Sequence, residues 1–192
     1  MLKRSHSRIA LVGLLTILLA YPSGAGARLI EGVYFTPRIT AAEVPLVLNG
    51  VGLKKLWQVV KVSVAALYLG EGVKPSTVLS NVPKRLEIEY FHPIAAKDFV
   101  MLTGKLLKQN VSPSTLAQLQ PRVDRLNALY RDVKPGDRYA LTYVPERGTT
   151  LALNGVDIGT IEGDDFAAAV FSIWLGPRPL SDSLKDELLG RI

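Results

Sequence analysis

Cysteine and histidine, which commonly serve as nucleophile, general base or zinc ligand, are absent or scarce in this chain. It has no cysteine and two histidines, so it offers neither a thiolate nucleophile nor a Cys/His zinc site. A Ser-His-Asp triad would need His92, which follows a predicted strand and has no Gly-x-Ser-x-Gly elbow to accompany it. We therefore expect His92 to be a partly exposed loop residue, and we expect no metal site and no cofactor.

The adjacent acids Asp164 and Asp165 are the other candidate for chemistry. A lone acidic pair without further ligands makes a poor metal site. Both residues open a predicted helix, where a carboxylate satisfies free backbone amides and interacts favourably with the helix dipole. Helix capping therefore explains this pair.

The first 27 residues have the three parts of a cleavable export signal. Three basic residues precede an uncharged run of 12 residues, Ile9–Ala20, and Ala25-Gly26-Ala27 offers a small-x-small cleavage site. The run is shorter than the about 20 residues that span a bilayer. We expect cleavage after Ala27 and a periplasmic or secreted protein without a membrane span; the alternative is an uncleaved membrane anchor.

Residues 28–192 are expected to form one domain, because no repeat, linker or low-complexity tract divides them. The whole chain has a net charge of +6, but half of this excess lies in the predicted export signal. What remains is too small to indicate nucleic acid as a partner, and no basic run is interleaved with aromatic residues. Without disulfides, packing alone must stabilise the domain.

Hydrophobic periodicity and turn signals predict an α+β domain with a mainly antiparallel sheet. A turn is expected at Asn49-Gly50 and a type I′ hairpin at Asn154-Gly155, while Ser112, Asp164 and Ser181 are expected to cap helices. The predicted strands cover residues 44–48, 52–69, 85–91, 138–144, 149–153 and 156–161, and the predicted helices cover 95–110, 113–131, 165–175 and a short stretch after 181.

The strand after Gly52 has strict alternation. Lys61 and Ser63 share one face with Ala65 and Leu67, and the intervening residues are aliphatic. One face is therefore expected to carry a hydroxyl and an ammonium, and the other only apolar groups.

Four segments resemble the exported chalcone isomerase-like proteins, in the same order along the chain. They are Leu48-Asn49-Gly50-Val51-Gly52 with the strand 60–69, the helix end Gly104–Asn110, Leu151–Gly155 with Gly163–Phe166, and Phe171–Gly176 followed by Pro179-Leu180. The resemblance implies an open-faced β-sandwich, a large antiparallel sheet covered by a layer of helices, with a ligand cleft between sheet and helices. This agrees with the fold class that the pattern predicts.

The resemblance also implies site residues: Lys54, Ser63, Thr103, Asn110 and Trp174. Lys54 stands where the family's enzymes and fatty-acid binders have arginine, and Ser63 where they have threonine or tyrosine. Thr103 replaces a tyrosine, Asn110 matches an asparagine, and Trp174 occupies a position that is polar in some catalytic members. A lysine cannot make the planar two-bond grip of arginine on a carboxylate, and the lost phenol removes a donor. These departures argue against chalcone isomerase catalysis.

Each of these residues also has a purely structural interpretation. Lys54 can be a solvated residue at a strand start, Ser63 a small residue that faces helix backbone, and Asn110 an ordinary helix terminator. Trp174 is most simply core or an apolar cleft wall.

The resemblance and the pattern together leave three functions open. We expect a non-catalytic binder of a hydrophobic small molecule, for example one that bears a carboxylate, since an apolar face with a few polar groups is typical of such pockets. The alternatives are an intramolecular lyase of the chalcone isomerase type, and a structural or interaction protein with a filled cleft.

Overall fold

The computed structural model describes residues 28–56 and 59–191, with only the backbone described at Leu56. The predicted export signal lies outside these residues. In chain order the elements are β1 Arg28–Ile30, β2 Val33–Phe35, β3 Arg38–Ala41, β4 Val44–Leu56, β5 Val60–Gly70, a 3₁₀ turn Pro75–Thr77, β6 Lys84–Tyr90, α1 Ala96–Asn110, α2 Pro113–Leu129, β7 Arg138–Val144, β8 Gly148–Leu153, β9 Val156–Ile161, α3 Asp164–Leu175 and α4 Asp182–Leu188.

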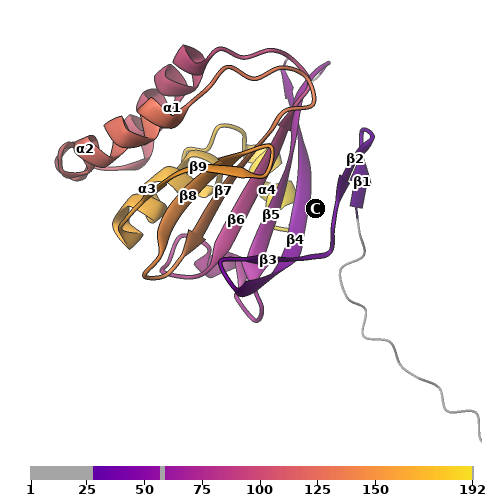
Figure 1. Cartoon of the computed structure of the whole chain (residues 1–192), viewed down its shortest axis with the longest axis horizontal. Helices are drawn as coiled ribbons and strands as arrows, with labels where there is room; N and C mark the ends of the chain where they lie inside the picture. Colours follow the sequence, from indigo (N-terminus) through magenta and orange to yellow (C-terminus); the bar gives the residue numbers. More distant parts are fainter. Residues whose placement is uncertain (1–27, 57–58, 192) are drawn as a thin grey trace, which may run out of the picture.

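Seven strands form one curled antiparallel sheet in the order β3-β4-β5-β6-β7-β8-β9 (Figure 1). Strands that follow one another in the sequence are neighbours in the sheet, and β6 and β7 remain neighbours although α1 and α2 separate them along the chain. The helices lie on one side of the sheet, and the small hairpin β1–β2 lies on the other (Figure 1). The predicted α+β fold, a large antiparallel sheet covered by helices, is confirmed.

From Ser63 onward, the inner strand β5 is buried on both faces. Ala65, Leu67 and Leu69 belong to the core beneath the helices, whereas Val64, Ala66 and Tyr68 belong to a second core beneath β1–β2. The alternation of side chains along a strand places these two sets on opposite faces. A β-branched and apolar sequence without interior charge is what such a doubly buried strand requires.

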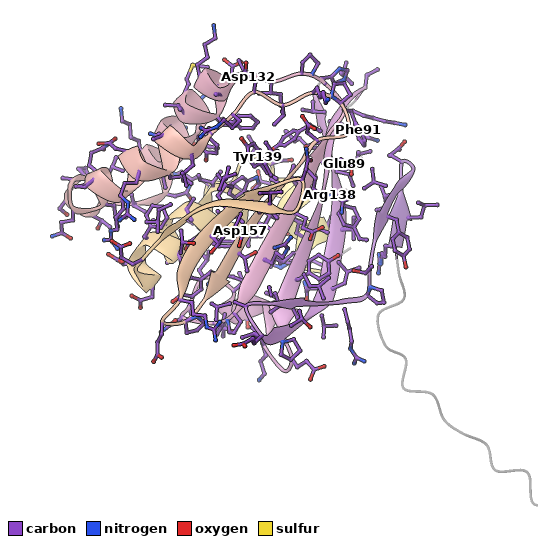
Figure 2. All side chains as sticks on the ribbon, viewed as in Figure 1. Glu89, Phe91, Asp132, Arg138, Tyr139 and Asp157 are labelled. Carbon is purple, nitrogen blue, oxygen red and sulfur yellow. The ribbon has the colours of Figure 1, made fainter. Side chains whose placement is uncertain are left out.

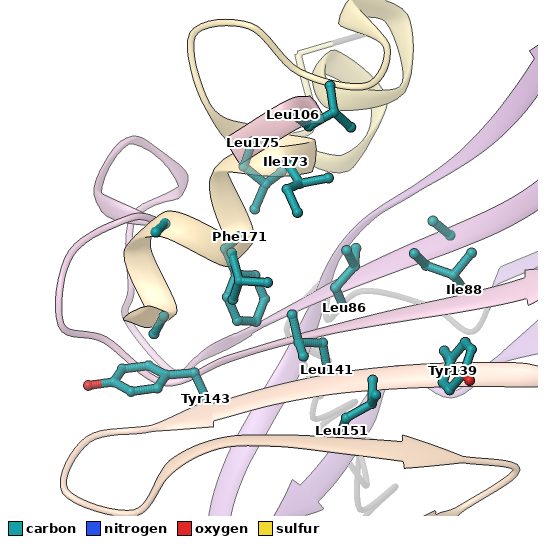
Figure 3. Close-up of a cluster of buried hydrophobic side chains, with 14 of the residues drawn as sticks. Leu86, Ile88, Leu106, Tyr139, Leu141, Tyr143, Leu151, Phe171, Ile173 and Leu175 are labelled. Atoms are coloured by element: carbon teal, nitrogen blue, oxygen red, sulfur yellow. The ribbon is translucent and has the colours of Figure 1, made fainter. Parts of the chain in front are cut away.

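The core under the helices is the larger of the two. Figure 3 shows Leu86, Leu141 and Leu151 of three adjacent strands pointing toward Phe171 and Ile173 of α3. α3 is almost wholly buried, which agrees with its nearly continuous apolar sequence.

The last helix lies on β4 at Gly50 and Gly52. A Cβ atom built at Gly50 would come within 2.3 Å of the Glu187 carbonyl oxygen, so no larger residue fits without moving the helix. The side chain of Asn49 donates to the Leu188 carbonyl, and the Leu53 amide donates to the Glu187 carboxylate. This Gly-x-Gly segment therefore serves helix packing.

Four local predictions are wrong. The expected strand 52–69 is two strands, since β4 ends at Leu56 and β5 begins at Val60, and the two pair antiparallel. Asn49-Gly50 is not a turn, because β4 continues through it with a register shift against β5, and α4 satisfies the adjacent polar groups. Gly163, not Asp164, is the N-cap of α3. Lys61 does not stay on the face of Ser63: a second register shift interrupts the alternation, and its ammonium donates to Glu31 in the β1–β2 turn.

Other local predictions are confirmed. Ser112 and Ser181 accept hydrogen bonds from backbone amides three residues later, as N-caps do. Asn154 and Gly155 have φ values of 52° and 82°, the left-handed conformations that a type I′ hairpin needs. In the part of the chain that the structure describes, no helix has the length and apolar character needed to cross a membrane.

Candidate ligand cleft

An apolar cavity lies between the helix layer and strands β6, β7 and β8. Its volume is about 40 Å³, enough for a few water molecules. Small-molecule pockets commonly measure roughly 300–1,000 Å³, so the cleft is nearly filled by its own side chains. Its lining consists of Leu86, Ile88, Tyr90, Phe99, Leu102, Thr103, Tyr130, Tyr139, Leu141, Leu151, Ile173 and Trp174.

Four aromatic rings occupy one end of this cavity. Phe99 of α1 stacks on Tyr130 at a centroid distance of 5.4 Å and meets Tyr90 and Tyr139 edge-on at the same distance. Edge-to-face and stacked pairs at these separations are favourable beyond the area that they bury. Phe99 is therefore the main contact between α1 and the sheet at this end.

The tyrosine hydroxyl groups in the cavity wall are protonated near neutral pH. Thr103 Oγ1 and Tyr130 Oη are 3.0 Å apart and hydrogen-bonded. Burial raises the pKa of Tyr130 to about 12 in spite of this bond, and burial also raises the pKa of Tyr90 well above its usual value. Near neutral pH these phenols can donate hydrogen bonds to a ligand oxygen, but they do not act as bases.

Two of the five sequence-predicted residues line the cavity. Thr103 is buried there and Trp174 forms a half-buried wall. Tyr90, Phe99, Tyr130 and Tyr139 also line it, and sequence analysis did not select them. No local sequence pattern marks these four aromatic residues as a cluster, because each lies in a different part of the chain and they meet only in the tertiary fold.

Lys54 and Ser63 form a polar row that leads to the cavity. Lys54 is paired in register with Ser63 across β4 and β5, and Ser63 is paired with Tyr90 across β5 and β6. Cross-strand partners point to the same face, here the face that the helices cover. Since neighbouring strands lie about 4.8 Å apart, the row extends ~10 Å from Tyr90 in the cavity wall to Lys54, which is half-buried.

Asn110 does not line the cavity. Its amide nitrogen donates to the carbonyls of Leu106 and Arg178, and its amide oxygen accepts from the Arg178 backbone amide at 3.0 Å. These bonds tie the end of α1 to the segment after α3. The geometry corresponds to the helix-terminating interpretation of this residue.

The two ends of the helical segment 94–133 are bonded to each other. Ile94 and Val133 exchange backbone hydrogen bonds of 3.0 and 2.9 Å, and the Asp132 carboxylate accepts from the Ala96 amide at the start of α1. Figure 2 shows Asp132 at these joined ends, beside the first turn of α1 and above Tyr139. Both chain connections of α1 and α2 therefore lie at one point, as in a flap.

Ion pairs hold the far end of this flap. Arg122 makes two bonds of 2.7 Å to the Asp165 carboxylate, and Arg125 contacts Glu162 at 2.8 Å. Surface ion pairs contribute little individually, but the two-bond Arg122–Asp165 geometry is the stronger kind. The acidic pair that sequence analysis assigned to capping thus supplies one ion-pair partner for α2.

Sequence analysis missed Lys84, a fully buried lysine at the other end of the same face. Its ammonium donates to the carbonyls of Ser80 (2.8 Å) and Val82 (3.2 Å) and lies over the rings of Tyr143 and Phe171. Desolvation lowers its pKa to about 8. A lysine in an otherwise alternating strand carries no sequence signal for such burial.

The opposite face of the sheet carries charges that neutralise one another. Arg138 pairs with Glu87 and Glu89 at 3.0 and 2.7 Å, and Arg85 pairs with Glu87 at 2.9 Å. Glu89 and Arg138 lie together in Figure 2. Because these groups satisfy each other, the cleft under the helices remains the better candidate for an apolar ligand.

Comparisons with known proteins agree with this geometry. A family model described as chalcone isomerase-like matches residues 27–190. No curated protein matches the chain. The crystal structure of a fatty-acid binding protein from Arabidopsis thaliana superposes with a TM-score of 0.64 at 14% identity, covering 86% of this chain and 96% of that one. At this identity the match shows the fold, and the family model shows the family: the chain belongs to the chalcone isomerase-like family.

Proposed function

We propose that this protein is a non-catalytic binder of an elongated hydrophobic molecule with a carboxylate head. The observation that carries the proposal is the polar row Lys54–Ser63–Tyr90, which ends in an apolar cavity on the same face of the sheet. An ammonium, a hydroxyl and a neutral phenol suit a carboxylate at one end, and the cavity suits a chain or ring at the other. The fatty-acid binding protein of the same fold supports this ligand class.

Binding requires the cleft to widen. A cavity of about 40 Å³ cannot hold such a ligand, so α1 must move away from the sheet. The flap geometry of residues 94–133 allows this movement, because the two chain connections lie together at the Ile94–Val133 pair. Phe99 would leave its aromatic neighbours, and the ligand would take its place against Tyr90 and Tyr139.

The cavity lining supports binding over catalysis. Among the described residues that line it, none is a carboxylate, imidazole or ammonium, and the raised pKa of Tyr90 and Tyr130 keeps both phenols protonated near neutral pH. A general acid or base works best with a pKa near the working pH. The lining can therefore orient a ligand but has no efficient group for moving its protons.

The small cavity volume favours one competing function, a structural or interaction protein with a permanently filled cleft. The two functions differ in what the helices do when a ligand is added. A binder opens and takes up one ligand, whereas a filled cleft takes up none.

Trp174 provides the readout that separates them. Replacing Trp57 with Phe leaves Trp174 as the single tryptophan, in the cavity wall. Dodecanoate should change its fluorescence saturably, and Lys54→Ala should weaken binding by about tenfold or more, since hydrogen bonds to charged groups contribute about 1.5–3 kcal/mol. Lys55→Ala is the matched control and should bind normally. An absence of saturable change, together with a single bare mass in native mass spectrometry after adding dodecanoate, would establish the filled cleft.

We also propose export with cleavage after Ala27, from the pattern of residues 1–27. Expression of the whole chain in a bacterium, followed by fractionation and intact mass measurement, tests this. The expected product begins at Arg28 and is found outside the cytoplasm. A full-length protein in the membrane fraction would contradict cleavage.

A further inference from the structure

Exposed apolar side chains gather at one end of the molecule. Among the described residues, six large apolar side chains are exposed, and four of them belong to the β1–β2 hairpin or to the β4–β5 hairpin. These are Leu29 (70% exposed), Tyr34 (53%), Val59 (80%) and Val60 (40%). The other two, Met101 and Val156, lie on α1 and on the β8–β9 hairpin.

The loops at this end form one continuous surface. Glu31 of the β1–β2 turn accepts a hydrogen bond from the Lys61 ammonium. A shallow hollow of about 350 Å³ is lined by Glu31, Val59, Lys61, Phe91 and His92, which come from three separate connections. Figure 2 shows Phe91 at the end of the sheet that faces the β1–β2 hairpin. We call Lys55, Val59, Val60 and Lys61, which lie together at the β4–β5 hairpin, the tip surface.

The tip surface has one more positive charge than its neighbouring acids neutralise, so it would attract an anion. Lys55 and Lys61 are direct cross-strand partners, an arrangement that like charges destabilise. Glu31 pairs with Lys61, while Lys55 has no ion pair with any residue that the structure describes. The other nearby acid on β6, Glu89, is held by Arg138. A basic side chain beside exposed aliphatic side chains matches the two parts of an anionic bilayer surface, the phosphates and the apolar region beneath them.

We propose that the tip surface docks reversibly on an anionic phospholipid surface. Val59 and Val60 enter the headgroup layer, and Lys55 contacts lipid phosphates beside the Lys61–Glu31 pair. The polar row starts at Lys54, next to Lys55, so docking turns that end of the cleft toward the lipid. The docking does not depend on the ligand proposed for the cleft, although it would suit a carrier that exchanges its ligand with a membrane.

Co-sedimentation with vesicles tests the proposal. The protein from Arg28 onward contains all elements of both cores and lacks the apolar N-terminal segment, which would itself bind lipid. We expect it to sediment with vesicles of phosphatidylcholine and phosphatidylglycerol, and at least about tenfold less with phosphatidylcholine alone. The Val59→Asp/Val60→Asp and Lys55→Glu/Lys61→Glu variants should each lose at least about tenfold in binding.

Met101→Asp/Val156→Asp and Lys105→Glu/Lys108→Glu are the matched controls, since they make the same two changes at exposed positions elsewhere. Both should bind like the wild type, and thermal unfolding should show that all four variants are folded. Equal loss in all variants, equal binding to neutral vesicles, or no binding would overturn the proposal. A concentration-dependent dimer that Val59→Asp/Val60→Asp abolishes, without vesicle binding, would assign the surface to a second copy of the chain instead.

Discussion

Lys54 and Lys84 lie on the same face of the sheet, near opposite ends, but they differ in burial and in hydrogen-bond partners. Lys84 is fully buried, donates to two backbone carbonyls and lies over two aromatic rings. Lys54 is half-buried, and its ammonium makes no hydrogen bond or ion pair with the residues that the structure describes. A buried ammonium without partners would be very costly, so Lys84 has its partners built in, whereas Lys54 remains available to a ligand.

The comparison separates a lysine that stabilises the fold from one that serves the site. If it is correct, changes at Lys84 alter stability, and changes at Lys54 alter binding but leave stability almost unchanged.

The largest expected effect is that of Lys84→Ala. It removes the donor to the Ser80 and Val82 carbonyls and leaves a cavity between Tyr143 and Phe171. We expect the free energy of unfolding in urea to fall by about 3 kcal/mol. Lys54→Ala should change it by less than about 0.5 kcal/mol. Equal losses of stability in the two variants would contradict the claim that only Lys84 stabilises the fold.

The lowered pKa of Lys84 should make the stability of the protein depend on pH. Its pKa is about 8 in the folded protein, whereas an unfolded lysine titrates near about 10.4. Between these values the unfolded chain binds more protons, so stability should rise with pH, by at most about 1.4 kcal/mol per pH unit. Lys84→Met should remove this rise in urea unfolding series from about pH 7 to pH 10, and a rise that persists in the variant would assign it to another group.

At higher pH, stability should fall with rising pH instead of increasing. Burial raises the pKa of Tyr68 and Tyr130 to about 12. An unfolded tyrosine titrates near about 10, so above this value the folded protein holds more protons and stability should fall. Lys84→Met should leave this fall in place, which makes it an internal control.

Asn110→Ala should have a smaller effect, and only on stability. It removes the hydrogen bonds that tie α1 to Arg178, for an expected loss of about 1–2 kcal/mol in urea unfolding. Dodecanoate affinity, measured on the same protein, should stay within about twofold of the wild type. A large loss of affinity without loss of stability would place the amide in the binding site.

Thr103→Val should have the smallest effect. It removes the hydroxyl that bonds to Tyr130 inside the cavity, at an expected cost of about 1 kcal/mol in unfolding. The pKa of Tyr130 should rise further, because the Thr103 hydrogen bond lowers it. Spectrophotometric titration of tyrosinate absorbance checks this direction, with Thr150→Val, on the opposite face, as the control.

Local patterns predicted most of the fold. Strands 138–144 and 156–161 have the predicted bounds, and Ser112 and Ser181 are the caps that were expected. Alternation and capping depend on residues close in the sequence, so they can be read without a structure. The turn predicted at Asn49-Gly50 was wrong, because the strand continues through these residues. The Asn49 side chain instead donates to α4, about 140 residues later in the sequence.

The site was less predictable than the fold. Thr103 and Trp174 came from the resemblance, but their aromatic neighbours did not, since Phe99, Tyr130 and Tyr139 meet only in the folded chain. The same holds for Lys84, whose carbonyl partners lie in an irregular loop. Contacts between distant elements carry no periodic signal.

NMR of dodecanoate labelled with carbon-13 at its carboxyl group is the most direct test of the central claim, that Lys54 contacts a carboxylate in the cleft. We expect a separate bound signal whose carboxyl pKa lies below that of the free acid, because a nearby ammonium favours the carboxylate. In Lys54→Ala this depression should disappear, while Lys55→Ala and Lys84→Met should retain it. A bound signal that titrates identically in the wild type and Lys54→Ala, or no bound signal at all, would contradict the claim.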